Sequence, residues 1–141
     1  MTGSSAYRPL PALTPRSEPY WKSGADACLR LQRCRSCRRF HHPPGPVCPY
    51  CLGSELDWES VSGAGTIYTF TLNHQPWYPG WSTPYVVASV KLDEQDDLRL
   101  TTNVVGCRPE DVRIGQRVRV CFERREDVWL PLFELARETR P

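Results

Sequence analysis

Four cysteines in two short-range pairs constrain this chain more than any other feature. They lie in the segments Cys34-Arg-Ser-Cys37 and Cys48-Pro-Tyr-Cys51, with ten residues between the two pairs. A Cys-x-x-Cys turn lets two thiolates converge on one ion, and two such turns provide the four soft ligands of a tetrahedral zinc site. The alternative is four buried thiols without a metal. We predict one structural Zn²⁺, because four thiolates leave no coordination position open for a reactant.

The length and the cysteine count narrow the class of protein further. The 141 residues suit one moderate domain or two very small ones, and 40% hydrophobic residues allow only a modest core. Seven cysteines are an odd number, and the Ser- and Pro-rich N-terminus shows no apolar export signal. No apolar run approaches the roughly 20 residues of a membrane span. These features favour a cytoplasmic protein with metal-bound thiolates over a secreted disulfide framework.

The N-terminal part of the chain is expected to hold a tail and a metal-binding unit. Prolines among small polar residues predict a flexible tail over residues 1–16. Ser17-Glu18-Pro19 is a typical helix start, and the short helix that follows carries Tyr20 and Trp21. So short a helix needs something to pack on. Residues 17–62 are therefore predicted to form this helix and a rubredoxin-like zinc ribbon, with the Pro-Pro-Gly-Pro turn at 43–46 delivering the second cysteine pair.

Residues 63–141 are predicted to form a barrel of short strands. β-branched and aromatic residues or clean apolar alternation mark five segments, at 66–72, 84–92, 98–105, 116–123 and 128–135. Glycines stand at the corners and no long helix is expected. Five short strands in about 70 residues are typical of the OB barrel. The predicted fold is thus mainly β: a short N-terminal helix, a zinc ribbon, and a five-stranded OB-fold barrel.

One loop between the first two barrel strands is unusually aromatic. Trp77, Tyr78 and Trp81 lie in a Pro/Gly-rich segment at 73–83 that also contains His74. Loops are mostly on the surface, and this much aromatic area is costly to leave in water. The three rings either fold back over one end of the barrel or bind a partner. His74 in a general-base role is not supported, because no serine, cysteine or carboxylate at a recognisable spacing completes a catalytic set.

The order of these motifs resembles a known family. Leu-Arg-Leu-Gln-Arg-Cys at 29–34 leads into the ribbon, and Pro-Pro-Gly-Pro-Val-Cys-Pro follows at 43–49. Gly-Ala-Gly-Thr-Ile-Tyr-Thr-Phe-Thr at 63–71, Pro-Tyr-Val-Val-Ala at 84–88 and the run from Asn103 to Gly115 complete the pattern. The chain is similar, from about residue 18 to about residue 135, to the acyl-CoA-associated OB-fold/zinc-ribbon family, long catalogued as a domain of unknown function.

The resemblance implies an accessory subunit that is not an enzyme alone. Its partner would be a thiolase-superfamily enzyme, most readily a lipid-transfer-protein-like aldolase that cleaves a 3-hydroxyacyl-CoA in steroid side-chain degradation. With a dimeric partner the expected assembly is a heterotetramer. Some relatives are fused to or paired with a hotdog-fold hydratase, for which the length leaves no room here. A 3-ketoacyl-CoA thiolase is the alternative partner.

The resemblance also suggests where a partner or an acyl-CoA thioester would bind. The residues expected at such an interface are Tyr20, Trp21, His74, Trp77, Tyr78, Trp81 and Tyr85. Four arginines cluster on the ribbon, and three of them are candidate contacts for coenzyme A phosphates or acidic partner residues: Arg35, Arg38 and Arg39. The alternative is that these three arginines bind no ligand and form, together with Arg33, a charged face exposed to water. His41 and His42 adjoin the ribbon, but the four cysteines make them unnecessary as ligands.

Two other functions need to be weighed. Zinc ribbons and OB barrels both bind single-stranded nucleic acid through basic grooves and stacking aromatics. However, 18 basic and 16 acidic residues give a net charge of only +2, and residues 93–97 form an acidic turn. Nucleic-acid-binding domains usually carry a larger positive excess. A free-standing hydrolase lacks a catalytic constellation, since Cys28, Cys107 and Cys121 have the surroundings of ordinary small residues.

Overall fold

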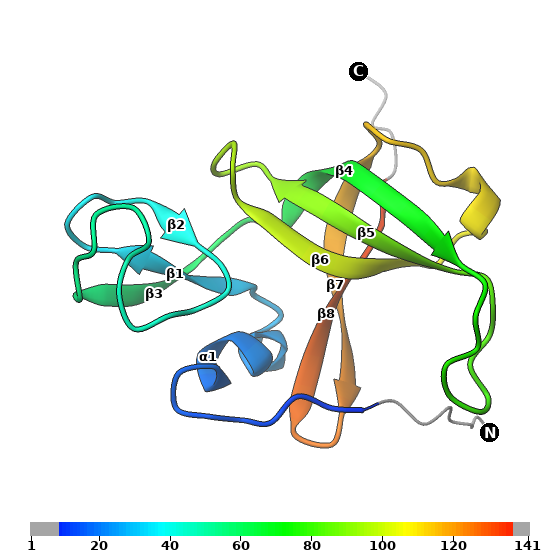
Figure 1. The fold of residues 1–141 in the computed structure, drawn as a ribbon, viewed down its shortest axis with the longest axis horizontal. Coiled ribbons are helices and arrows are strands. Elements are labelled where there is room, and N and C mark those ends of the chain that lie inside the picture. Colours follow the sequence, from blue (N-terminus) through cyan, green and yellow to red (C-terminus); the bar gives the residue numbers. More distant parts are fainter. Residues whose placement is uncertain (1–8, 137–141) are drawn as a thin grey trace.

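A computed structural model of the chain describes residues 9–136 (Figure 1). The chain begins with a one-turn helix α1 (Glu18–Trp21) and a 3-10 turn η1 (Ser23–Asp26). A three-stranded antiparallel sheet of order β2-β1-β3 follows, built from β1 (Arg30–Cys34), β2 (Phe40–His41) and β3 (Leu56–Ser60). This sheet is the base of the ribbon, and it confirms the strands expected on either side of the cysteine pairs.

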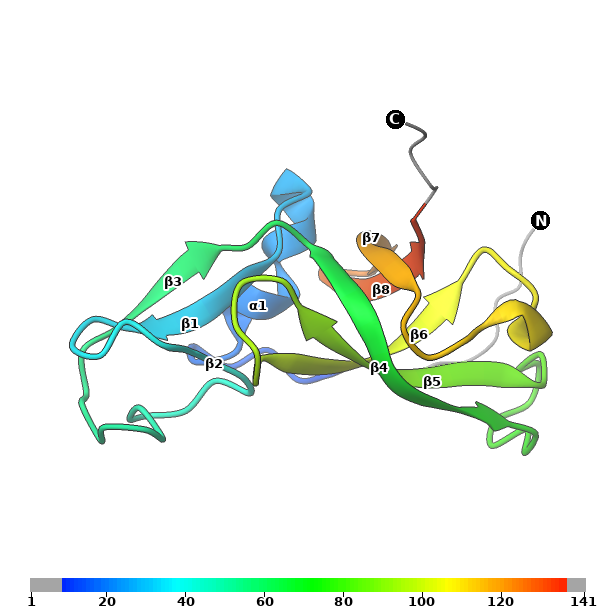
Figure 2. The same cartoon turned by 90° about the horizontal axis from the view of Figure 1, so that it is seen from above.

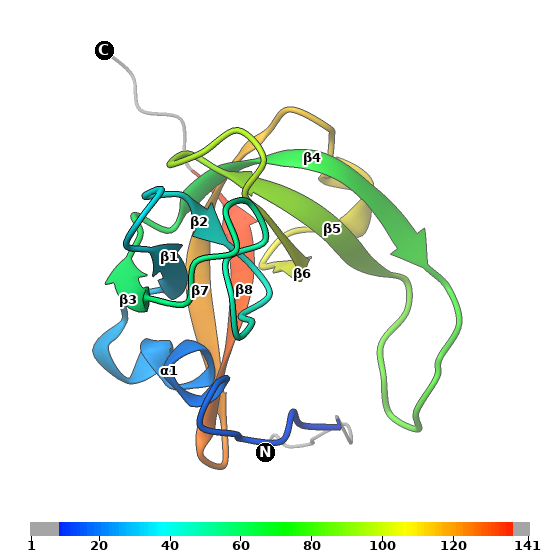
Figure 3. The same ribbon diagram turned by 60° about the vertical axis from the view of Figure 1, so that its left-hand side comes forward.

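The remaining strands close into the predicted five-stranded barrel. They are β4 (Ala64–Asn73), β5 (Tyr85–Leu92), β6 (Arg99–Val105), β7 (Arg117–Arg125) and β8 (Val128–Leu135). Their order around the barrel is β4-β5-β6-β8-β7, and the pairing of β7 with β4 closes it (Figures 2 and 3). Only the β6–β8 pairing is parallel among the described strands. This order is that of an OB barrel, with a 3-10 turn η2 (Pro109–Asp111) between β6 and β7.

Alternation along the strands builds the barrel interior. Every second residue of β5 is buried, namely Val86, Ala88, Val90 and Leu92. A bulge between Ile67 and Thr69 shifts the register of β4 against β5, which adds the local bend that a small barrel requires. Among residues 9–136, no helix is long and apolar enough to cross a membrane.

The ribbon and the barrel share one hydrophobic core. Leu31 and Phe40 of the ribbon belong to the same buried cluster as Val90 and Phe133 of the barrel. The boundary expected at residue 62 falls in the connection between β3 and β4, but the core crosses it. The expected tail lies outside the described residues up to residue 8, whereas Leu13 packs against a second, smaller cluster formed by β8.

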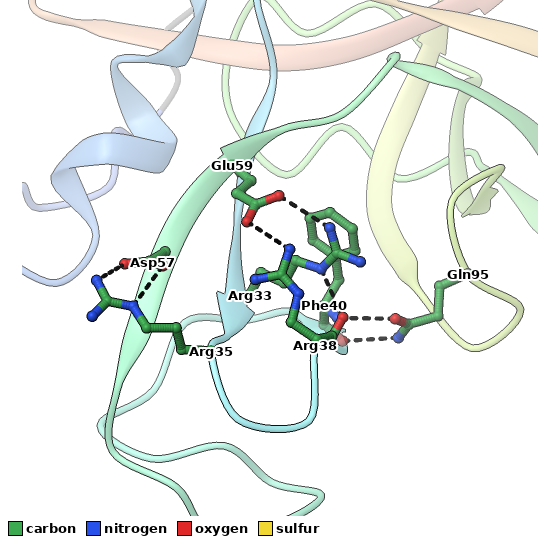
Figure 4. A network of polar contacts seen from close by, with 7 residues as sticks. All are labelled: Arg33, Arg35, Arg38, Phe40, Asp57, Glu59 and Gln95. Carbon is green, nitrogen blue, oxygen red and sulfur yellow. Dashed lines mark hydrogen bonds and ion pairs between the residues drawn. The ribbon is translucent and has the colours of Figure 1, made fainter.

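A turn of the barrel docks against the open edge of the ribbon sheet (Figure 4). The side-chain amide of Gln95, in the β5–β6 turn, accepts from the Phe40 N–H at 2.9 Å and donates to the Phe40 carbonyl at 2.8 Å. Asp97 in the same turn accepts from Arg39 at 2.5 Å and from the Tyr50 hydroxyl at 3.0 Å. The acidic turn therefore attaches the ribbon to the barrel, which satisfies the outward-facing backbone of edge strand β2.

The N-terminal helical turns pack on the outer face of the β7–β8 hairpin (Figure 1). The backbone of η1 lies very close to the hairpin at Gly24. A Cβ atom added there would lie 2.5 Å from Cβ of Trp129 and 2.7 Å from the ring of Phe122. Because the Trp129 Cβ is fixed to the strand backbone, only glycine permits this packing distance.

We predict that Gly24→Ala destabilises the chain by about 1–3 kcal/mol, because overpacking forces the helical turns away from the hairpin. Denaturant unfolding followed by tryptophan fluorescence measures the effect. Gly45→Ala is the matched control, since a Cβ at Gly45 meets its nearest atom only at 3.7 Å. Equal stability of the two variants would contradict this account of the packing.

A second prediction concerns the docking of the β5–β6 turn. Gln95→Ala leaves the N–H and carbonyl of Phe40 without partners, and buried unsatisfied groups cost about 1–3 kcal/mol each. We expect a lower unfolding free energy and faster amide hydrogen exchange at Phe40. The neighbouring Asp96 is fully exposed, so Asp96→Ala serves as control and should change neither quantity. An unchanged rate of amide hydrogen exchange at Phe40 in Gln95→Ala would contradict this prediction, because it would mean that water replaces the Gln95 side chain with no loss of stability.

Candidate functional site

The four predicted cysteine ligands converge on one point. The Sγ atoms of Cys34, Cys37, Cys48 and Cys51 all lie within 4.8 Å of one another. The Cys34–Cys51 and Cys37–Cys48 sulfur pairs are 3.5 and 3.6 Å apart. Tetrahedral ligands about 2.3 Å from a zinc ion lie roughly 3.8 Å from each other. The cluster therefore fits a single tetrahedral metal ion.

The two cysteine turns have the same backbone conformation. The N–H of Arg38 donates to the carbonyl of Cys34 at 2.9 Å, and the N–H of Leu52 donates to the carbonyl of Cys48 at the same distance. Arg38 and Leu52 are both left-handed, with φ of 68° and 66°. This conformation is uncommon outside glycine, and it turns each chain back so that two sulfurs face one ion.

Backbone dipoles and sulfur proximity set the electrostatics of the cluster. The N–H of Cys37 donates to Cys34 Sγ at 3.5 Å and is the largest cause that lowers the pKa of Cys34 to about 6. At Cys51 the N–H of Gly53 lowers the thiol pKa, but the neighbouring thiols and burial outweigh it and raise that pKa to about 11. Four thiolates this close repel one another, and a divalent cation at their centre removes that repulsion.

The two ribbon histidines lie outside this cluster. His41 is 4% exposed, and its Nε2 is 2.8 Å from the side-chain oxygen of Gln32. The His42 ring packs against the ring of Tyr20, with the centroids 4.7 Å apart. Burial lowers the pKa of both imidazoles, that of His42 to about 4, so both are neutral at pH 7. Neutral rings packed in this way have structural roles.

The ribbon arginines all pair with carboxylates, and Figure 4 shows three of these pairs. Arg35 makes a two-pronged contact with Asp57 at 2.8 and 3.0 Å, and this contact raises its pKa. Glu59 pairs with both Arg33 and Arg38, and Arg39 pairs with Asp97. The predicted phosphate contacts at Arg35, Arg38 and Arg39 would thus have to replace existing ion pairs. They stay a prediction.

The aromatic loop forms a ring cluster at the far end of the barrel from the ribbon (Figure 1). Trp81 lies between Tyr78 and Tyr85, with ring centroids 5.1 and 5.3 Å apart. The Tyr85 hydroxyl accepts from the Asn73 side chain at 2.9 Å. Trp77 is 63% exposed, and His74 is exposed beside it. Three rings thus pack together and one projects into solvent, and binding of this loop to a partner stays a prediction.

The other predicted interface residues lie elsewhere. Tyr20 is only 6% exposed and belongs to the shared core, while Trp21 is half-buried against both clusters. Sequence reasoning missed an exposed apolar patch on the second cysteine turn, formed by Val47, Tyr50 and Leu52. The sequence signal that could have predicted this exposure is the position of these apolar residues in the loop around the second cysteine pair, where metal binding and not burial sets the conformation.

The described hydroxyl and thiol groups form no nucleophile–histidine pair. Within 9–136, no serine, threonine or cysteine is hydrogen-bonded to a histidine. The Cys28 thiol contacts the Ser60 hydroxyl at 3.0 Å, without a base beside it. Burial raises the pKa of the Cys107 and Cys121 thiols, which makes them poorer nucleophiles.

We predict that the purified chain holds one zinc ion and that Cys51→Ser lowers its affinity by more than the roughly 10–100-fold typical of second-shell changes. Metal analysis and a colorimetric chelator titration measure this loss. Cys51 is exposed, so the substitution leaves no cavity. Cys28→Ser is the control and should keep its zinc. A full zinc content in Cys51→Ser would exclude the four-thiolate site.

Comparison with known proteins agrees with this architecture. Residues 21–57 match the model of the ChsH2 rubredoxin-like zinc ribbon domain, and residues 58–123 match that of the ChsH2 C-terminal OB-fold domain. A chain of the solved structure described as an Ltp2-ChsH2(DUF35) aldolase is 34% identical, with a TM-score of 0.79 over 89% of this chain and 98% of that one.

Two curated relatives extend the comparison. A probable enoyl-CoA hydratase alpha subunit of Thermomonospora curvata is 40% identical over 93% of this chain, which spans 41% of that protein's length. A DUF35 domain-containing scaffold protein of Methanocaldococcus jannaschii is 37% identical over 69% of each chain. The converging cysteines, the OB strand order and these matches agree: the chain belongs to the ChsH2/DUF35 family, in which a rubredoxin-like zinc ribbon precedes an OB-fold domain.

Proposed function

We propose that the chain is a non-catalytic subunit of a thiolase-superfamily enzyme, with a lipid-transfer-protein-like aldolase as its partner. The observation that carries this proposal is the likeness of 89% of this chain to 98% of a chain in the Ltp2-ChsH2(DUF35) aldolase structure. The lack of a hydroxyl or thiol hydrogen-bonded to a histidine among residues 9–136 supports it, as does a cysteine cluster whose four sulfurs would fill the ligand positions of a tetrahedral ion. The partner would supply the residues that cleave a 3-hydroxyacyl-CoA.

The aromatic loop is the proposed anchor for the partner. Trp77 exposes most of its ring to water, although aromatic burial is strongly favourable. The packed rings of Tyr78, Trp81 and Tyr85 hold the loop in place, so less freedom is lost when a partner covers Trp77. Pairing with a dimeric enzyme through this surface would give a cytoplasmic heterotetramer and would place the loop near the acyl-CoA entrance.

The proposal is tested by co-expression with a thiolase-like protein encoded nearby, followed by size-exclusion chromatography. We expect one complex that cleaves a 3-hydroxyacyl-CoA by retro-aldol reaction. Thiolysis of a 3-ketoacyl-CoA by the same complex would instead identify the partner as a thiolase. A chain that stays monomeric beside every such candidate would overturn the accessory-subunit proposal.

We predict that Trp77→Ala weakens the partner association by at least about tenfold, because aromatic anchors at interface centres contribute about 2 kcal/mol or more. Biolayer interferometry with the zinc-loaded chain measures the dissociation constant. Leu52→Ala is the control, since Leu52 is 74% exposed on the ribbon, away from the loop. Unchanged affinity in Trp77→Ala would rule out the loop as the anchor.

A further inference from the structure

An open cleft lies where the N-terminal segment, α1, the ribbon and β6 meet. Its volume is about 640 Å³, which is in the range of small-molecule sites. Thr14 and Arg16 border it from the N-terminal segment, Trp21 from α1, and Arg99 and Thr101 from β6. It shares no lining residue with the aromatic loop proposed to bind the partner. The cleft therefore needs its own explanation.

Two arginines without a carboxylate partner lie at this cleft. Eight described arginines pair with carboxylates: Arg30, Arg33, Arg35, Arg38, Arg39, Arg108, Arg117 and Arg125. Five others form no ion pair with any residue in 9–136, and two of these five, Arg16 and Arg99, line the cleft. The Arg99 guanidinium lies 4.1 Å from the ring centroid of Tyr68, a contact that leaves its charge without a carboxylate. No described carboxylate lines it. Two uncompensated cations, 83 positions apart in the sequence, thus face one cavity.

Flat and hydroxyl-bearing side chains form the rest of the wall. Tyr20, Trp21 and His42 give three ring systems, and the edge of the wall is completed by Pro43 and Pro44. The Nδ1 atom of His42 is buried and has no hydrogen-bond partner among the described residues. A buried ring nitrogen without a partner is costly, and a ligand or a trapped water that enters the cleft would remove this cost.

We propose that this cleft binds a small organic anion in which a flat ring system carries a phosphate group. The guanidinium groups of Arg16 and Arg99 hold the phosphate, since a planar fork of N–H donors matches phosphate oxygens. The ring system packs between the face of Trp21 and the proline edge at Pro43 and Pro44. Thr101 also lines the cleft, and its hydroxyl provides a further donor. This assignment places anion binding in the cleft and leaves the ribbon arginines in their ion pairs.

The test uses the full zinc-loaded chain and two-dimensional ¹H–¹⁵N NMR. The indole N–H of Trp21 is the reporter, assigned with Trp21→Phe. Three probes are titrated separately. ADP contains both the ring system and the phosphates, adenosine contains only the ring system, and inorganic phosphate contains only the charged group. We expect ADP to shift the Trp21 indole signal in a saturable way and to bind at least about tenfold more tightly than either fragment.

Arginine variants distinguish ADP binding in the cleft from nonspecific electrostatic attraction of ADP to the chain. Arg99→Gln and Arg16→Gln should each weaken ADP binding by about tenfold. Arg124→Gln removes the same charge from an arginine that stacks on Trp129 outside the cleft, and it should bind ADP normally. A thermal melt checks that each variant is folded. Equal weakening in all three variants, equal binding of adenosine and ADP, or no shift at millimolar ADP would each overturn the proposal.

Discussion

The convergence of four sulfurs is the constraint on which the rest of the ribbon depends. Between β2 and β3 the chain runs through fourteen residues without regular structure, and Cys48 is the only hydrophobic one of them that is buried. Such a segment cannot hold its shape by packing. Closing a metal cluster would hold Tyr50, whose hydroxyl donates to Asp97 of the barrel turn, and the proline turn, which lines the cleft together with α1. One contact of the docked barrel turn and one wall of the cleft therefore rely on the cluster.

The elements and the metal ligands could be predicted from the sequence because their signals are local. Strand alternation, the cysteine spacing and the glycine at position 63 each act over a few residues. The attachment of the ribbon to the barrel could not be predicted from the sequence, since Gln95 and Phe40 are 55 residues apart. A glutamine in an acidic turn does not indicate which backbone groups its side-chain amide will bind. The same limit applies to Gly24, whose need for glycine comes from Trp129 on a distant strand.

The arginines show how sequence proximity misleads. Arg35, Arg38 and Arg39 are close in the sequence and predict a basic patch, yet their charges are met by Asp57, Glu59 and Asp97 in the folded chain. Arg16 and Arg99 show no pattern in the sequence, and the fold brings them to one cavity. Local charge density in the sequence thus does not show which arginines keep a carboxylate partner after folding.

The position of the aromatic loop bears on how the chain would act on a partner. The β4–β5 loop lies at the opposite end of the barrel from the ribbon (Figures 1 and 3). Its rings are fixed to β4 and β5, which pair along eight positions, so the loop inherits the rigidity of the barrel. A rigid anchor loses little conformational entropy on binding. The metal then influences the anchor only through the core that both parts share, so a stable barrel is what the metal contributes to a partner surface far from it.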